Sequence, residues 1–319
     1  MNKKILNIFL LLTFLVSGIV VFADSLSVES DKQEFKDNES KIYLEGNVKV
    51  KSGSVNVLSP KAVVEVNPKN HKVDRVEFQD NAYSYYMESG KKHEIKAQVL
   101  EMSLLNKFFT AQGDSISTIT EKDRPVVIVT ADRQEYNKKT NVMKAFGNVN
   151  ILYKDIETFS EKAVVELNKD NDVKNIELIG SANLKQNKSR IQANSLSFDN
   201  VKQEAIATGN VHTTIVTEDG KTIEVWSAYQ SYDKPTNMVS ASGSTKVKYE
   251  DYYAQGPKVN VFADKETKKL NEAVFVGRSK IETKGRTIEA DRISITMNPK
   301  DFKAEGNVKS VIPNIGNMN

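Results

Sequence analysis

The sequence predicts an all-β protein built from stacked strand–turn–strand repeats, and three observations lead to that prediction. A phrase centred on glycine recurs about every 33 residues along a chain of 319 residues. A second phrase, in which alanine precedes alternating apolar residues, recurs about midway between the glycines. No stretch after residue 24 has the periodicity of a helix. Because the period is nearly constant, one supersecondary unit stacked on its own copies explains the chain better than a mixture of elements.

The glycine phrase reads apolar-x-Gly-Asn-Val-x-apolar in its clearest copies, and degenerate copies keep the spacing. Asp80 stands where one further glycine is expected, and the steps from Gly46 to Gly306 are 34, 33, 34, 33, 29, 34, 34 and 29 residues. The glycines are Gly46, Gly113, Gly147, Gly180, Gly209, Gly243, Gly277 and Gly306. Apolar residues of one parity flank each glycine, so we interpret it as a bend where a strand passes from one sheet into a facing sheet. The alternative is an ordinary hairpin turn.

The alanine phrase supplies a strand with alternating apolar residues, as in residues 162–167 and 288–295. A polar turn rich in Asn, Asp and Pro separates many of these phrases from the next glycine, as in residues 66–71 and 297–301. The repeated unit is therefore strand, turn, strand.

The first 23 residues have the parts of a secretory signal peptide. Lys3 and Lys4 precede an apolar run from residue 5 to 21, and Val21-Phe22-Ala23 forms a small-residue cleavage site. An uncleaved membrane anchor is the alternative. Cleavage leaves 43 basic and 42 acidic side chains, a net charge of +1, which gives no electrostatic reason to expect nucleic-acid binding. We expect residues 24–319 to form one continuous array, with two fused modules of about 24–152 and 153–319 as the alternative.

The residues that commonly carry chemistry are absent or scattered. The chain has no cysteine, and its three histidines, His71, His93 and His212, lack metal-ligand spacing and are expected at the surface. Neither a nucleophile elbow nor a phosphate-binding glycine loop is present. The sequence therefore predicts a protein that is not an enzyme and that needs no metal or cofactor.

The two phrases together resemble the repeats of the OstA-like family of lipopolysaccharide transport proteins. The best-matched copies are residues 145–151, 207–211 and 303–308 for the glycine phrase, and residues 191–198 and 288–295 for the other. The family includes the periplasmic bridge LptA, the membrane-anchored LptC and the N-terminal domain of LptD. The resemblance covers nearly all of the mature chain and is strongest to a long LptA-type periplasmic protein.

This resemblance implies an elongated β-jellyroll, in which two antiparallel sheets face each other as a V-shaped trough. Lipid A acyl chains lie in the trough, and subunits join end to end through open edge strands, with LptC-like and LptD-like partners at the inner and outer membranes. The alternating pattern independently predicts one apolar face on every strand, for which a fully packed β-sandwich core is the alternative. The expected trough-lining residues are Val48, Val50, Val64, Val66, Val149, Ile151, Val165, Leu167, Leu196, Phe198, Val211, Val259, Val261, Ile293 and Ile295.

The predicted function is a periplasmic lipopolysaccharide-binding transport bridge between the inner and outer membranes. A structural β-solenoid or surface stalk is the alternative, and a polysaccharide-processing β-helix enzyme is a further one. The three hypotheses differ in what they require of the interior: an open apolar groove, a dry packed core, or a local cluster of carboxylates.

Overall fold

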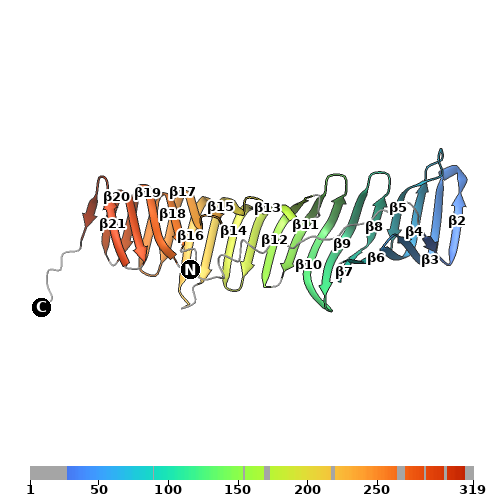
Figure 1. Ribbon diagram of the computed structural model, residues 1–319, viewed down its shortest axis with the longest axis horizontal. Coiled ribbons are helices and arrows are strands. Elements are labelled where there is room, and N and C mark those ends of the chain that lie inside the picture. Colours follow the sequence, from blue (N-terminus) through green and yellow to red (C-terminus); the bar gives the residue numbers. More distant parts are fainter. Residues whose placement is uncertain are drawn as a thin grey trace. The chain divides into compact units, whose positions relative to one another are not determined.

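The computed structural model describes residues 27–88, 90–153, 155–168, 173–216, 220–263, 270–283, 285–297 and 300–312. Within these ranges the protein has 22 strands, assigned to one antiparallel sheet, and no α-helix (Figure 1). The all-β prediction is confirmed. The proposed signal peptide lies outside the described residues.

The chain forms two compact units, and the boundary between them falls at Leu178 and Ile179. We call them the N-terminal unit (27–178) and the C-terminal unit (179–312). The alternative of two fused modules that meet near residue 152 remains a prediction.

The strands of the N-terminal unit mostly pair with their neighbours in sequence. Where a strand is interrupted, its two pieces pair with one longer partner: β7 and β8 both pair with β9, and β1 and β2 both pair with β3. The strands are β1 (Ser27–Glu29), β2 (Lys32–Lys36), β3 (Lys41–Ser52), β4 (Val55–Val66), β5 (Val73–Gln79), β6 (Ala82–Glu88), β7 (Lys91–Ala97), β8 (Val99–Ser103), β9 (Phe108–Glu121), β10 (Arg124–Asn137), β11 (Val142–Tyr153) and β12 (Ile156–Leu167), followed by β13 (Val173–Gln186), which contains the unit boundary.

The C-terminal unit continues the same antiparallel pattern, and β21 and β22 both pair with β20. Its strands are β14 (Ser189–Asp199), β15 (Glu204–Val216), β16 (Thr222–Asp233), β17 (Met238–Tyr249), β18 (Tyr252–Ala263), β19 (Leu270–Thr283), β20 (Arg286–Met297), β21 (Lys300–Glu305) and β22 (Lys309–Val311).

The recurring glycines form corners, and all of them except Gly306, which lies between β21 and β22, are inside strands. Gly147 has a φ of +70° and Asn148 a φ of +48°, while β11 runs through both residues and its pairing with β12 skips from Phe146 to Val149. Glycine tolerates this left-handed backbone without cost, and asparagine tolerates it better than most residues. The bend interpretation is therefore confirmed, and the alternative of hairpin turns is wrong because the strand continues beyond the glycine.

At several of these corners, an aspartate from an earlier segment accepts a hydrogen bond from the asparagine that follows the glycine. A Cβ atom at Gly147 would lie 2.0 Å from Asp132 Oδ2, so only glycine fits beneath this carboxylate. Asn148 Nδ2 donates hydrogen bonds to both carboxylate oxygens at 3.2 and 3.3 Å. The same Asn-to-Asp bond joins Asn47 to Asp31 at 2.9 Å and Asn307 to Asp291 at 2.7 Å. The repeated alanine and glycine phrases thus meet each other in space.

The corners divide the pairing of β9, β10 and β11 into two ladders. Residues 115–121 of β9 pair with the start of β10, and residues 108–112 pair with its end. The register shift in β10 lies between these two ladders. Each of these strands consequently contributes one half to each of two walls. The first wall comprises β6, β7, residues 156–160 of β12 and the pairing of 115–121 with 124–131. The second wall comprises β8, residues 162–166 of β12 and the pairing of 108–112 with 133–137.

Candidate functional site

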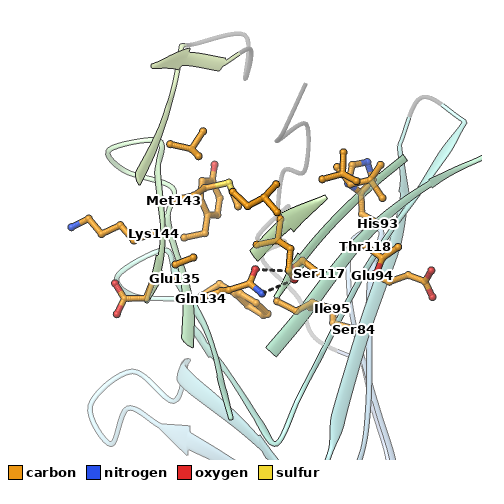
Figure 2. Close-up of a pocket in the computed structure, with 18 of the residues that line it drawn as sticks. Ser84, His93, Glu94, Ile95, Ser117, Thr118, Gln134, Glu135, Met143 and Lys144 are labelled. Atoms are coloured by element: carbon orange, nitrogen blue, oxygen red, sulfur yellow. Dashed lines mark hydrogen bonds between the residues drawn. The ribbon is translucent and has the colours of Figure 1, made fainter. Parts of the chain in front are cut away.

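The N-terminal unit contains an apolar cavity of about 140 Å³, partly open to solvent, between these two walls. Figure 2 shows His93, Ile95 and Thr118 on strands on one side, and Gln134 and Met143 on strands on the other. A single strand supplies both sides: β10 contributes Val127 and Val129 before its corner and Tyr136 after it. The cavity therefore follows directly from the bend in the strands.

Half-buried apolar side chains form much of the cavity lining. Ile95, Ile119, Val129 and Met143 are all partly accessible, whereas Val127 is fully buried. Partly accessible apolar side chains around a cavity can contact a ligand without prior unfolding of the core.

A buried glutamine joins the two walls beside the corner of β10. Gln134 Oε1 accepts a hydrogen bond from Ser117 Oγ at 2.7 Å (Figure 2). Its Nε2 donates to the Val129 carbonyl oxygen at 3.3 Å and to Ser115 Oγ at 3.1 Å. Since Gln134 follows the corner and Val129 precedes it, these bonds hold the two halves of β10 at a fixed angle.

The same arrangement recurs 96 residues later in the C-terminal unit. Gln230 Oε1 accepts from Thr213 Oγ1 at 2.7 Å, and Gln230 Nε2 donates to the Val225 carbonyl oxygen at 3.4 Å. A tyrosine follows two positions after each glutamine, Tyr136 and Tyr232, and both are buried. Burial raises the pKa of Tyr136. Burial, together with a smaller contribution from the charge of Asp233, raises the pKa of Tyr232 to about 12.

This Gln-x-Tyr pair occupies positions that other repeats fill with apolar residues. Leu196-Ser197-Phe198 and Ile293-Ser294-Ile295 stand at the equivalent places, two and four residues after the residue that covers the corner glycine. The alternation of apolar residues in the sequence does not reveal these glutamines, because they are polar. Alignment of the repeats by their glycines would have shown Gln134 and Gln230 at this position, together with Gln33, which is exposed.

His93 lies in the cavity, and the prediction that it lies at the surface is wrong. Its side chain is 6 % exposed and stacks on Tyr86, with ring centroids 4.6 Å apart and planes 7° from parallel. Nε2 is buried and has no hydrogen-bond partner. Burial, assisted by the nearby charge of Lys91, lowers the pKa of His93 to about 4, so the imidazole is neutral at pH 7.

The other two histidines are more accessible than His93. His71 is exposed, and the His212 side chain is 31 % exposed, beside Glu224 at 3.4 Å and stacked on Trp226. Among the described residues no cluster of His, Cys, Asp or Glu could hold a metal ion.

The fifteen residues predicted to line a trough all have buried or half-buried side chains. Twelve are buried, and Val66, Val261 and Ile295 are half-buried. Only Ile151 and Val165 border the cavity of the N-terminal unit. Val48, Val211 and Ile293 are at most 1 % exposed, which places them in the packed interior.

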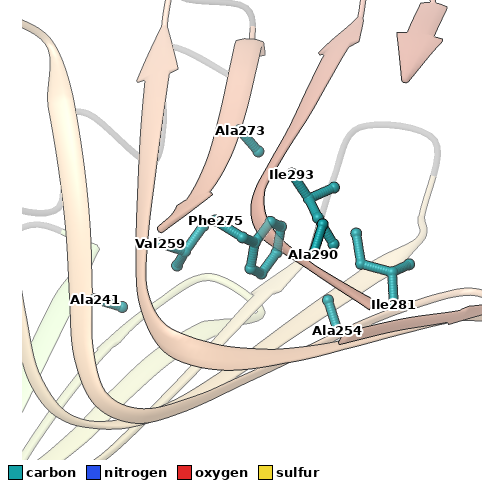
Figure 3. Close-up of a cluster of buried hydrophobic side chains, with 8 residues drawn as sticks. All are labelled: Ala241, Ala254, Val259, Ala273, Phe275, Ile281, Ala290 and Ile293. Carbon is teal, nitrogen blue, oxygen red and sulfur yellow. The ribbon is translucent and has the colours of Figure 1, made fainter. Parts of the chain in front are cut away.

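The C-terminal unit has a packed apolar cluster in its interior (Figure 3). Phe275 and Ile293 are its largest fully buried members, and alanines surround them. The cluster comprises Ala241, Ala254, Val259, Ala273, Phe275, Ile281, Ala290 and Ile293.

The bent strands and the apolar cavity define an all-β protein with an interior suited to apolar ligands. A family model described as the LptA/(LptD N-terminal domain) LPS transport protein matches residues 27–125 and 128–189, which is half of the chain. The protein therefore belongs to this family of lipopolysaccharide transport proteins, and the resemblance noted from its repeats is confirmed.

Among the solved structures that match is LptH of Pseudomonas aeruginosa, described as the LptA homologous periplasmic component of the lipopolysaccharide transport device. It is 12% identical, with a TM-score of 0.26, and the match covers 45% of this chain and 76% of LptH. No curated protein matches this chain. Within the described ranges, no helix is long and apolar enough to span a membrane.

Proposed function

We propose that this protein is a periplasmic bridge that binds lipopolysaccharide and carries it between the inner and outer membranes. The single observation that carries this proposal is the apolar cavity between the two walls of the N-terminal unit. Each methylene of an acyl chain that leaves water contributes about 0.8 kcal/mol, so even a short buried stretch gives useful affinity. The sugar and phosphate groups remain in solvent, since most of the cavity lining is apolar.

The cavity holds only part of an acyl chain at one time. Its volume of about 140 Å³ is close to the roughly 150 Å³ of engineered apolar cavities that hold benzene. We propose that further methylenes lie against the half-buried side chains of Ile119, Val129 and Met143. Ile151 and Val165 then contact the ligand directly, and the other fully buried members of the predicted set within the N-terminal unit support the wall behind it.

We propose that the edge strands join this protein to OstA-like partners, LptC-like at the inner membrane and LptD-like at the outer membrane, and to copies of itself. Among the described strands, β1 and β2 pair with β3 alone, and β22 pairs with β20 alone. An edge strand with free backbone groups can accept a strand from another chain. Export through cleavage of residues 1–23 would place the protein in the periplasm with these partners.

Photo-crosslinking in the native envelope tests the lipid part of the proposal. We expect a photoreactive amino acid at Met143, which lines the cavity, to capture lipopolysaccharide. Leu152 in the same strand is the matched control, because it is an exposed apolar side chain that does not line the cavity. Equal capture at both positions, or none at Met143, would contradict the proposal and favour a structural stalk.

The same method tests the edges. Crosslinkers at Ser27 in β1 and Lys309 in β22 should capture partner chains, whereas one at exposed Lys174 in β13 should not. Capture at Lys174 alone would overturn association through the edges.

A further inference from the structure

We propose that His93 binds a hydroxyl group carried on the aliphatic chain of the ligand. This inference rests on the proposed function, because it assigns a polar subsite within the same cavity. It predicts a preference among acyl chains that an apolar cavity alone would not have.

The evidence is an unpartnered polar atom on the inward face of β7. His93 and Ala97 are buried on this face, and Lys96 between them in sequence is exposed. His93 Nε2 has no partner, whereas the polar atoms of Gln134 and of Tyr136 in the same cavity are hydrogen-bonded. A buried polar atom without a partner is unfavourable, and a ligand that pairs with it removes that penalty.

The chemistry of a neutral imidazole selects the partner. Nε2 donates a hydrogen bond if it carries the ring proton and accepts one if Nδ1 carries it. A hydroxyl group can accept in the first case and donate in the second. A carboxylate or phosphate would have to leave water for an apolar cavity, where the neutral His93 gives no compensating charge. A hydroxyl on an otherwise apolar chain therefore fits both the nitrogen and its surroundings.

Stacking on Tyr86 holds the ring in place for this role. The two rings lie nearly parallel at 4.6 Å, and Tyr86 and His93 face each other across the pairing of β6 and β7. A histidine fixed by a neighbour loses little freedom when it binds, which favours selectivity between similar chains.

The test compares tetradecanoate with tetradecanoates that carry one hydroxyl at carbon 3, 7 or 11. Affinity is measured by displacement of a bound fluorescent fatty acid from the purified protein. We expect at least one hydroxylated chain to bind about three- to tenfold more tightly than the plain chain. In His93→Phe, which keeps a ring for Tyr86, the preference should vanish while the plain chain still binds. Lys96→Gln, on the outward face of the same strand, should keep the preference.

The outcomes separate the inference from the function on which it rests. If the wild-type protein binds plain and hydroxylated chains equally, or if His93→Phe retains the preference, the subsite is refuted while the apolar cavity stands. If neither kind of chain binds the wild-type protein, the proposed function fails, and the subsite fails with it.

Discussion

The two units use the same repeat but fill their interiors differently. In the N-terminal unit, His93, Gln134 and Met143 border a cavity of about 140 Å³. In the C-terminal unit, Phe275 and Ile293 pack among alanines in a closed cluster. The backbone corners are alike in both units, so the difference arises from the inward side chains. Walls set by a repeat can thus hold either a cavity or a core, depending on a few substitutions.

Both units nevertheless keep the glutamine that joins the two halves of a bent strand. Gln134 and Gln230 have equivalent partners, namely Ser117 and Thr213 on one side and the carbonyl oxygens of Val129 and Val225 on the other. Because this link is common to a unit with a cavity and a unit with a packed cluster, it serves the geometry of the corner. The residues specific to the N-terminal cavity, above all His93, are the better candidates for ligand selection.

The largest effect is expected from truncation of the cluster in the C-terminal unit. Phe275→Ala removes a buried ring from tightly packed surroundings and should lower the free energy of unfolding by about 3–5 kcal/mol. Met143→Ala, in the N-terminal unit, removes a half-buried side chain that already borders a cavity and should cost only about 1 kcal/mol. Urea denaturation measures both. Equal costs would show that the two interiors are packed alike.

A smaller effect on the free energy of unfolding is expected at acidic pH, and it arises from His93 in the N-terminal unit. The pKa of His93 is lowered to about 4 in the folded protein, whereas an unfolded histidine has its ordinary value of 6.5. Between these values the unfolded chain binds the extra proton, so folding stability is full above pH 6.5 and falls as the pH approaches 4. Linkage gives a loss of about 2 kcal/mol between pH 7 and pH 5.

The matched variant His93→Phe isolates this contribution. Carboxylates titrate in both proteins, and their effect cancels when urea unfolding of the two is compared at pH 7 and pH 5. The wild-type protein should lose about 2 kcal/mol more than the variant. Identical pH dependence would mean that His93 is accessible to protons in the folded state.

The sequence predicted the strands and corners well because both depend on local, repeated signals. Glycine and asparagine favour a left-handed backbone, so Gly147 and Asn148 predict a corner from residue type alone. The alternation of apolar residues places Val149 and Ile151 on the buried face. The cavity depends instead on which side chains meet across the two walls. His93 stands among lysines and glutamate in sequence, and only the fold shows that it faces inward. Gln134 was overlooked for the same reason.

The smallest effect is expected at the corners, which differ in the residue that covers the glycine. In the N-terminal unit Asp132 covers Gly147 and binds Asn148, but in the C-terminal unit Ala228 covers Gly243, which is followed by Ser244. A groove of about 640 Å³ lies along that corner and those of the following strands. The Gly243 corner keeps its left-handed backbone without a carboxylate, so the hydrogen bond is an addition to the bend and not its cause.

Asp132→Ala should therefore preserve the corner and cost only about 0.5–1 kcal/mol, as expected for a shared hydrogen bond from one amide group at an exposed site. The matched variant Ala228→Asp should gain little, since Ser244 replaces the asparagine donor. Urea denaturation gives the magnitudes, and amide exchange along β11 shows whether the pairing on both sides of Gly147 persists. A loss of several kcal/mol, or loss of amide protection across β11, would show that the N-terminal corner depends on its carboxylate in a way that the C-terminal corner does not.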